Sequence, residues 1–172
     1  MNILKMGMIL MSMLIGMYNF HGLQTLIQPV SRGTIDHRQV DSLRESLVYL
    51  GCPERQVREI SNGITIASDR TGISRLLISS LLYTESRFRL SATSSKGYRG
   101  IMQTPTATMI YPEVDILHGA MILKEKLHLA KGNMLAALAL YKGGRNPEAR
   151  KQAIYVVKIY NNLLSRRAEG AV

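Results

Sequence analysis

Cysteine is almost missing from this chain of 172 residues, because Cys52 is its only one. A single cysteine excludes an internal disulfide framework and a zinc site built from several thiolates. Acidic residues are also few: 12 Asp and Glu stand against 22 Lys and Arg, which gives a formal net charge of +10. This imbalance indicates attraction to something anionic, such as nucleic acid, lipid headgroups or an acidic wall polymer. Long uncharged apolar runs do not recur along the chain, which excludes a polytopic membrane protein.

Motifs for several kinds of chemistry are missing as well. The sequence contains neither a glycine-rich phosphate-binding loop nor a dinucleotide-binding fingerprint. Its basic residues are not interleaved with aromatic ones, which make up 6% of the chain, so nucleic acid is not the expected partner. The histidines are too scattered to share a metal, since even His118 and His128 would stand roughly 15 Å apart along one helix. We therefore expect no metal and no cofactor.

The first 22 residues differ from the rest of the chain. Lys5 is followed by Met6 to Phe20, an uncharged and mainly apolar stretch. This stretch is shorter than the roughly 20 residues of a membrane-spanning helix, and it matches the basic and apolar regions of a signal peptide. No alanine precedes Ala67, so a cleavage site of the A-x-A type is absent. Residues 1–22 are therefore predicted to be a signal peptide or an N-terminal membrane anchor.

Export would place the function in the periplasm or cell envelope, with anchoring to the inner membrane if the segment stays uncleaved. Residues 23–38 are polar and rich in turn formers, which is typical of a linker.

Residues 39–168 are predicted to form one mostly α-helical domain. Apolar residues recur at helical spacing, and Pro, Gly, Ser or Asn stands where most helices should begin or end. The periodicity breaks between residues 90 and 103, where small residues and two glycines indicate an irregular or hairpin lobe. The expected helices cover residues 40–50, 53–71, 74–86, 116–132, 133–143 and 147–164.

Glu85 is the acidic residue whose position is most suggestive of chemistry. It follows Leu81 and Leu82 by about one helical turn and precedes the turn-rich lobe. A carboxyl packed on apolar neighbours has a raised pKa, because burial disfavours its charged form, and it can then deliver a proton at neutral pH. Taken alone, Glu85 is better explained as an ordinary residue at a helix end, either solvated or paired with Arg87.

The residues that follow Glu85 resemble a known family. Glu85-Ser86-Arg87-Phe88, Ala92-Thr93-Ser94 and Gly97-Tyr98-Arg99-Gly100-Ile101-Met102-Gln103 occur at fixed intervals. They are similar to the signature E-S-x-F, A-x-S, G-A-x-G-L-M-Q of soluble lytic transglycosylases of the lysozyme-like superfamily. Leu138 to Tyr141 with Gly143 resembles the family's A-Y-N-x-G segment. The resemblance covers roughly residues 55–165 and implies a lysozyme-like fold, that of the α+β lysozyme superfamily.

This resemblance implies that Glu85 is the single catalytic acid and base. Its substrate would be the glycan strand of peptidoglycan, cut at the β-1,4 bond between N-acetylmuramic acid and N-acetylglucosamine to leave 1,6-anhydromuramoyl ends. The substrate's own acetamido group would assist, so a second carboxylate is not needed. The nearest later acids, Glu113 and Asp115, are expected to form a loop and helix-start pair favoured by the helix dipole.

The resemblance also implies that Ser94, Gln103 and Tyr141 bind substrate. Ser94 would orient the acetamido group, Gln103 would contact the sugar in the groove, and Tyr141 would stack on a sugar ring. Read without the family, Ser94 could bond its own backbone, Gln103 could cap the following segment, and Tyr141 could be ordinary helix packing. Met102 is expected in the core.

Three positions depart from the family pattern. Tyr98 replaces a small residue between the glycines, Thr104-Pro105 shortens the usual continuation, and Lys142 stands where Asn follows the cleft tyrosine. We expect these changes to alter how substrate is held before they affect the chemistry.

Two further functions fit the same residues. A lysozyme-type muramidase would use the same fold to hydrolyse the bond, and a non-catalytic subunit of a secretion, conjugation or phage assembly would only bind peptidoglycan.

Overall fold

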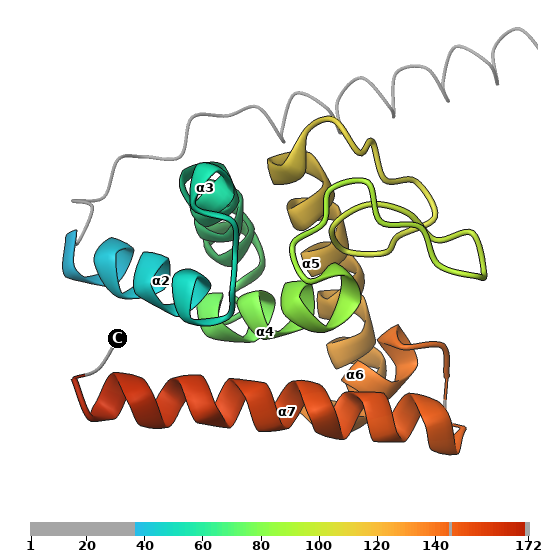
Figure 1. Ribbon diagram of the computed structural model, residues 1–172. Coiled ribbons are helices and arrows are strands. Elements are labelled where there is room, and N and C mark those ends of the chain that lie inside the picture. The colour runs from blue at the N-terminus through green and yellow to red at the C-terminus, as the bar shows by residue number, and fades with distance from the viewer. Residues whose placement is uncertain (1–36, 145, 171–172) are drawn as a thin grey trace, which may run out of the picture. The chain divides into compact units, whose positions relative to one another are not determined.

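The computed structural model describes residues 37–144 and 146–170, with side chains from residue 41 onward. Within these ranges the chain forms six helices and no sheet (Figure 1). The described residues belong to one compact unit. The predicted segment 1–22 and residues 23–36 of the predicted linker lie outside them. The helices are α2 (His37–Tyr49), α3 (Glu54–Thr71), α4 (Arg75–Ser86), α5 (Pro112–Leu129), α6 (Met134–Tyr141) and α7 (Pro147–Ala168).

The mostly α-helical fold predicted from the sequence is confirmed. α5 begins at Pro112, earlier than the predicted Ile116, because proline at the first helical position is already set to helical geometry. Within the described residues, no helix is both long and apolar enough to cross a membrane.

Capping residues set the helix ends. Gly72 takes a left-handed conformation with φ of +75° after α3, and its N–H donates to the Ser68 carbonyl. Asn133 caps α6, since its side-chain oxygen accepts the Ala136 N–H at 3.0 Å. Ser74 stands at the N-cap of α4, but its side chain makes no capping hydrogen bond there.

α4 is the most deeply buried helix of the fold. Every residue from Leu76 to Leu82 is buried. Ser79 and Ser80 are tolerated among them because their hydroxyls donate to the carbonyls of Arg75 and Leu76 within the same helix. A helix that is buried all round is held by its neighbours on every side, here α2, α3 and α7. α4 therefore gives its C-terminal turn a firm support.

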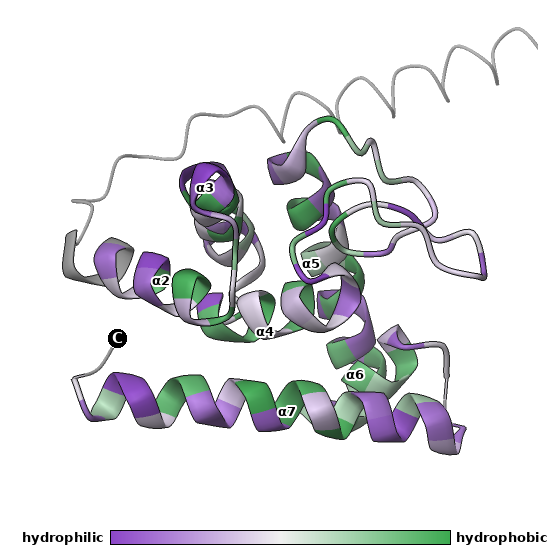
Figure 2. Ribbon diagram, viewed as in Figure 1, coloured by the Kyte–Doolittle hydropathy of each residue, from purple (hydrophilic) through white to green (hydrophobic). Residues whose placement is uncertain are grey.

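α7 lies beside α4 and covers the core from one side (Figure 1). Figure 2 shows hydrophilic and hydrophobic residues alternating along its length. This pattern is typical of a helix with one face on the core and the other in solvent. Its buried residues recur at helical spacing: Ala149, Ala153, Val156 and Leu163.

The segment between α4 and α5 forms the irregular lobe that the sequence predicts. Two isolated antiparallel bridges, Thr93 with Arg99 and Arg99 with Thr104, fold it into a small hairpin. Gly100 sits where space is short, because an added Cβ would lie 2.7 Å from the Ala107 Cβ. Its φ of +73° also favours glycine.

Asp115 ties this lobe to the start of α5. It is buried, and its two carboxylate oxygens accept the N–H groups of Thr108 and Met109 at 2.7 and 2.9 Å. Asp115 and Glu113 both lie in the first turn of α5, where a negative charge is favoured. Asp115 therefore has a structural role, and both of its oxygens are already bound.

We expect Asp115→Ala to destabilise the domain by about 3 kcal/mol, because two charge-assisted hydrogen bonds are lost and two backbone donors are left without their acceptor. Urea unfolding followed by circular dichroism measures this change. Glu113→Gln is the matched control, because it removes only a charge near the same helix terminus and should cost about 0.5 kcal/mol. Equal losses in the two variants would show that the dipole, and not the loop, is the source of the stabilisation.

Candidate active site

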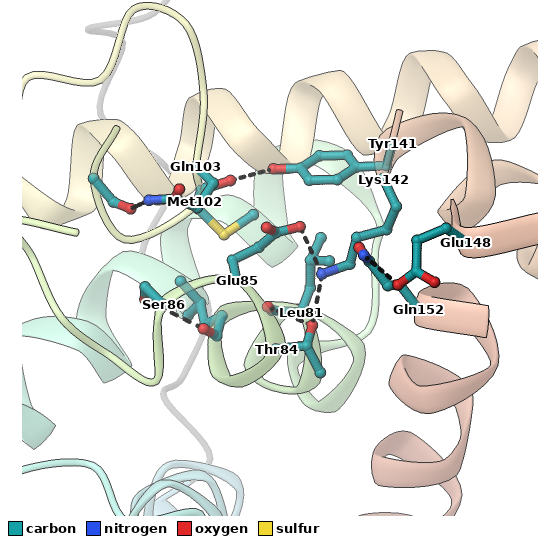
Figure 3. Close-up of polar contacts among 12 residues, drawn as sticks. Leu81, Thr84, Glu85, Ser86, Met102, Gln103, Tyr141, Lys142, Glu148 and Gln152 are labelled. Atoms are coloured by element: carbon teal, nitrogen blue, oxygen red, sulfur yellow. Dashed lines mark hydrogen bonds and ion pairs between the residues drawn. The ribbon is translucent and has the colours of Figure 1, made fainter. Parts of the chain in front are cut away.

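Glu85 lies in the last turn of α4 and points into the protein. Its side chain is 12% exposed, and its Oε1 lies 2.9 Å from the Nζ of Lys142 (Figure 3). The carboxyl is thus neither solvated nor paired with Arg87, whose guanidinium lies over the Tyr83 ring instead. A buried helix end holds this carboxyl in one place.

Lys142 follows α6 and reaches across to α4. Its side chain is 5% exposed, and its Nζ also donates to the Thr84 hydroxyl at 3.1 Å. Lys142 and Glu85 are therefore joined in a nearly buried ion pair. Such a pair costs desolvation on both sides, which its Coulomb attraction and hydrogen bonds must offset.

The environment of Glu85 changes its acidity in two opposing ways. Burial raises the pKa of the Glu85 carboxyl above its ordinary value, because the charged form loses its hydration. The Lys142 ammonium opposes this rise through its charge and its hydrogen bond. Burial is the larger effect, so the pKa stays raised. A carboxyl with a raised pKa can hold a proton closer to neutral pH and act as a general acid.

Tyr141 lies next to this pair at the end of α6. Its hydroxyl donates to the Met102 carbonyl at 2.9 Å, which joins α6 to the lobe. The pKa of Tyr141 is raised well above its ordinary value by burial and, to a smaller extent, by the negative charge of Glu85. The hydroxyl therefore stays protonated and keeps donating.

Met102 is fully buried, as the sequence predicts. It packs against α5 at Gly119, where an added Cβ would lie 2.7 Å from the Met102 Cβ. The absence of a side chain at Gly119 thus lets the lobe approach α5 closely. This approach fixes the Met102 carbonyl that Tyr141 uses.

Gln103 follows Met102 and closes the hairpin of the lobe. Its Nε2 donates to the carbonyls of Ala92 and Gly100 at 3.1 and 2.8 Å. Its backbone has a φ of +51°, which non-glycine residues rarely adopt. Both hydrogens of the amide are therefore used within the lobe, and Oε1 has no hydrogen-bond partner in the described residues.

Ser94 lies at the tip of the hairpin, and its hydrogen bonds stay within that hairpin. Its hydroxyl oxygen accepts the Tyr98 N–H at 3.0 Å, and its own N–H donates to the Tyr98 carbonyl at 2.8 Å. Ser94 is partly exposed. The tip approaches the turn after α6 through Lys96, whose Nζ lies 3.8 Å from where a Cβ on Gly143 would stand.

The structure thus brings Glu85, Lys142 and Tyr141 together, with the Met102 carbonyl bound to Tyr141 and Gln103 next along the chain (Figure 3). The sequence singled out three of these positions as site residues, but the direct contact between Lys142 and Glu85 was missed. The sequence signal that could have indicated this contact was lysine at position 142, where the family pattern has asparagine. A pocket of about 210 Å³ lies beside Lys142, lined by Thr84, Lys142, Glu148, Lys151, Gln152 and Tyr155.

Cys52 contributes nothing to this site. It is 5% exposed, and burial raises the pKa of its thiol to about 11. A thiol of this kind stays protonated at neutral pH and serves as a small packing residue.

Comparison with known proteins agrees with this geometry. Residues 63–163 match the family model described as the transglycosylase SLT domain. No solved structure matches the chain. The match spans more than half of the 172 residues and includes Glu85, the lobe, Tyr141 and Lys142. The chain therefore belongs to the transglycosylase SLT domain family, whose members have lysozyme-like activity on peptidoglycan.

Proposed function

We propose that the protein is a lytic transglycosylase of peptidoglycan. It would cut the β-1,4 bond between N-acetylmuramic acid and N-acetylglucosamine and leave 1,6-anhydromuramoyl ends. The observation that carries this proposal is the Glu85 carboxyl, buried at the end of α4 with a raised pKa, inside the matched family region. It is the position and environment that a general acid needs.

Glu85 acts in two steps. Protonated Glu85 donates its proton to the glycosidic oxygen as the bond to the muramoyl C1 breaks, and the substrate's acetamido oxygen stabilises C1. The carboxylate then takes the proton of the muramoyl C6 hydroxyl as that oxygen attacks C1 and closes the anhydro ring. Each proton given is matched by one taken, so Glu85 ends in its starting form and no water is consumed.

Asp115, one of the two later acids considered in the sequence, supports a mechanism with one carboxylate, because both of its oxygens are committed to backbone N–H groups. Hydrolysis by two carboxylates would need a second acid across the scissile bond. Substrate assistance removes that requirement.

We further propose substrate-binding roles for Ser94, Gln103 and Tyr141. The Ser94 hydroxyl accepts one hydrogen bond and can still donate its own proton to an acetamido oxygen. The Gln103 Oε1 can accept from a sugar hydroxyl. Tyr141 would present its ring to the sugar while its hydroxyl holds the lobe in place.

The substrate also accounts for the charge of the chain and for where the protein would act. Peptidoglycan carries peptides with free carboxylates, which a net charge of +10 would attract at long range. We propose that residues 1–22 direct export to the periplasm or cell envelope, either as a cleaved signal or as an anchor in the inner membrane. Service to a secretion, conjugation or phage machine is compatible with this location.

Mass spectrometry of digested peptidoglycan tests the proposal. Purified sacculi incubated with the protein are expected to release muropeptides with 1,6-anhydro ends, whose mass is lower than that of the hydrated products by one water molecule. Reducing ends would show a muramidase instead. Binding to sacculi by folded protein without any release would show a non-catalytic binding subunit.

A further inference from the structure

Lys142 contacts Glu85 directly, although the family pattern has asparagine at this position. Its Nζ lies 2.9 Å from Glu85 Oε1 and 3.1 Å from Thr84 Oγ1. The ammonium is nearly buried, so little water screens the attraction between the two charges. An asparagine side chain would be shorter and uncharged, so it could offer only a neutral hydrogen-bond donor and no positive charge.

The contact matters because Glu85 must carry a proton to begin the proposed reaction. An ammonium at hydrogen-bond distance favours the carboxylate, which is the form that cannot donate. After the first proton transfer the same ammonium stabilises the carboxylate that has formed. The Lys142 ammonium therefore disfavours the protonated Glu85 that begins the reaction and favours the carboxylate that forms from it.

We propose that Lys142 is a positioning residue that sets the pH at which Glu85 acts as an acid, by holding the free carboxyl in its charged form above that pH. This inference rests on the proposed function. It makes the protein a transglycosylase whose activity is shifted toward acidic pH by lysine in the place of asparagine.

Other charged and titratable groups near the pair come from three elements. Tyr141 of α6 stays protonated and donates to the Met102 carbonyl. The lobe brings Lys96 toward Gly143, and α7 contributes further side chains to the pocket beside Lys142. The groups from α7 are Glu148, Lys151 and Tyr155. The charge that acts on Glu85 directly is that of Lys142, which lowers the pKa of the carboxyl, whereas burial raises it.

The test compares the pH dependence of kcat/KM for the wild type, Lys142→Asn, Lys142→Met and Lys142→Arg on soluble glycan fragments. Without the ammonium, Glu85 keeps its proton to higher pH. The alkaline limb of the pH profile, where kcat/KM falls, should therefore move to higher pH by about one unit or more in Lys142→Asn and Lys142→Met. At a pH well above the wild-type limb, a shift of about one pH unit means that the fraction of enzyme with protonated Glu85 is about tenfold larger in the variant than in the wild type. Lys142→Arg keeps the charge and should retain the wild-type limb.

Lys124→Asn is the matched control, because it removes an exposed positive charge from α5 and should leave the limb unchanged. A limb that stays in place in Lys142→Asn and Lys142→Met would overturn the proposal. So would a limb that moves equally in Lys142→Arg, since the charge would then be irrelevant.

A second readout separates this inference from the proposed function. The Glu85 carboxyl can be titrated by nuclear magnetic resonance in the full chain labelled with ¹³C at glutamate, and assigned by its loss in Glu85→Gln. Lys142→Asn should raise the midpoint of this titration whether or not glycan is cut. An unchanged midpoint would overturn the role of Lys142. A raised midpoint without muropeptide release from wild-type protein would overturn the reaction alone.

Discussion

Glu85→Gln is expected to lower the turnover of peptidoglycan by about 100-fold or more. Glutamine keeps the size of the side chain but cannot give a proton to the glycosidic oxygen or take one from the C6 hydroxyl. Both steps of the proposed reaction therefore lose their only acid or base. Release of soluble muropeptides, followed by chromatography against time, measures the loss.

Two further measurements make this result specific. Circular dichroism must show the same helix content as the wild type, since the substitution removes the charge that pairs with the nearly buried Lys142. Glu125→Gln is the control, because its carboxylate is 62% exposed and pairs with the adjacent Lys126. Its turnover should equal that of the wild type. Activity of Glu85→Gln close to the wild-type level would refute the assignment of the acid.

Much of the scaffold could be predicted from sequence because its signals are local. In α3, Val57, Ile60, Ile64 and Ala67 recur at helical spacing and are buried together, and Gly72 ends the helix in a left-handed conformation. Periodicity and capping depend on residues a few positions apart, so they can be read without knowing the fold. The same holds for the position of Glu85 in the last turn of α4.

The contacts of the site could not be predicted in this way. Lys142 and Glu85 meet because α6 and α4 are placed against the same core, and nothing in the residues around either position specifies that placement. The bond from Tyr141 to the Met102 carbonyl likewise joins residues 39 positions apart. The family motif predicted which residues belong to one site. It did not indicate that lysine in the place of asparagine would contact the acid.

The side chains of the lobe show a related limit. For Ser94 and Gln103, sequence reasoning left open both a local role and a role in binding substrate. The structure shows the local hydrogen bonds of both residues, and Gln103 Oε1 has no partner in the described part of the chain. Side-chain hydrogen bonds add to the backbone hydrogen bonds that hold this hairpin, and they come from the side chains proposed to face the sugar. Local and binding roles are therefore compatible at the same residue.

Tyr141 connects the scaffold to the site, and substitutions there are expected to have the second largest effect. Tyr141→Phe keeps the ring but leaves the Met102 carbonyl, in a fully buried residue, without its donor. The free energy of unfolding should fall by about 1 to 3 kcal/mol. Tyr141→Ala also removes a large side chain that packs on the core, and should cost about 3 to 5 kcal/mol. Urea unfolding of both variants measures these losses.

The two variants also separate anchoring from contact with substrate. If the hydroxyl mainly anchors the lobe, Tyr141→Phe should shift Met102 and Gln103 and lower activity together with stability, because catalysis depends on a substrate held in register with Glu85. If the ring also stacks on sugar, Tyr141→Ala should raise KM further than Tyr141→Phe at temperatures where both are folded. Tyr111→Phe is the control, since that residue is 57% exposed. If the stability of Tyr141→Phe is unchanged, the hydrogen bond to Met102 does not hold the lobe. The proposal that α6 positions Gln103 through this bond would then be refuted.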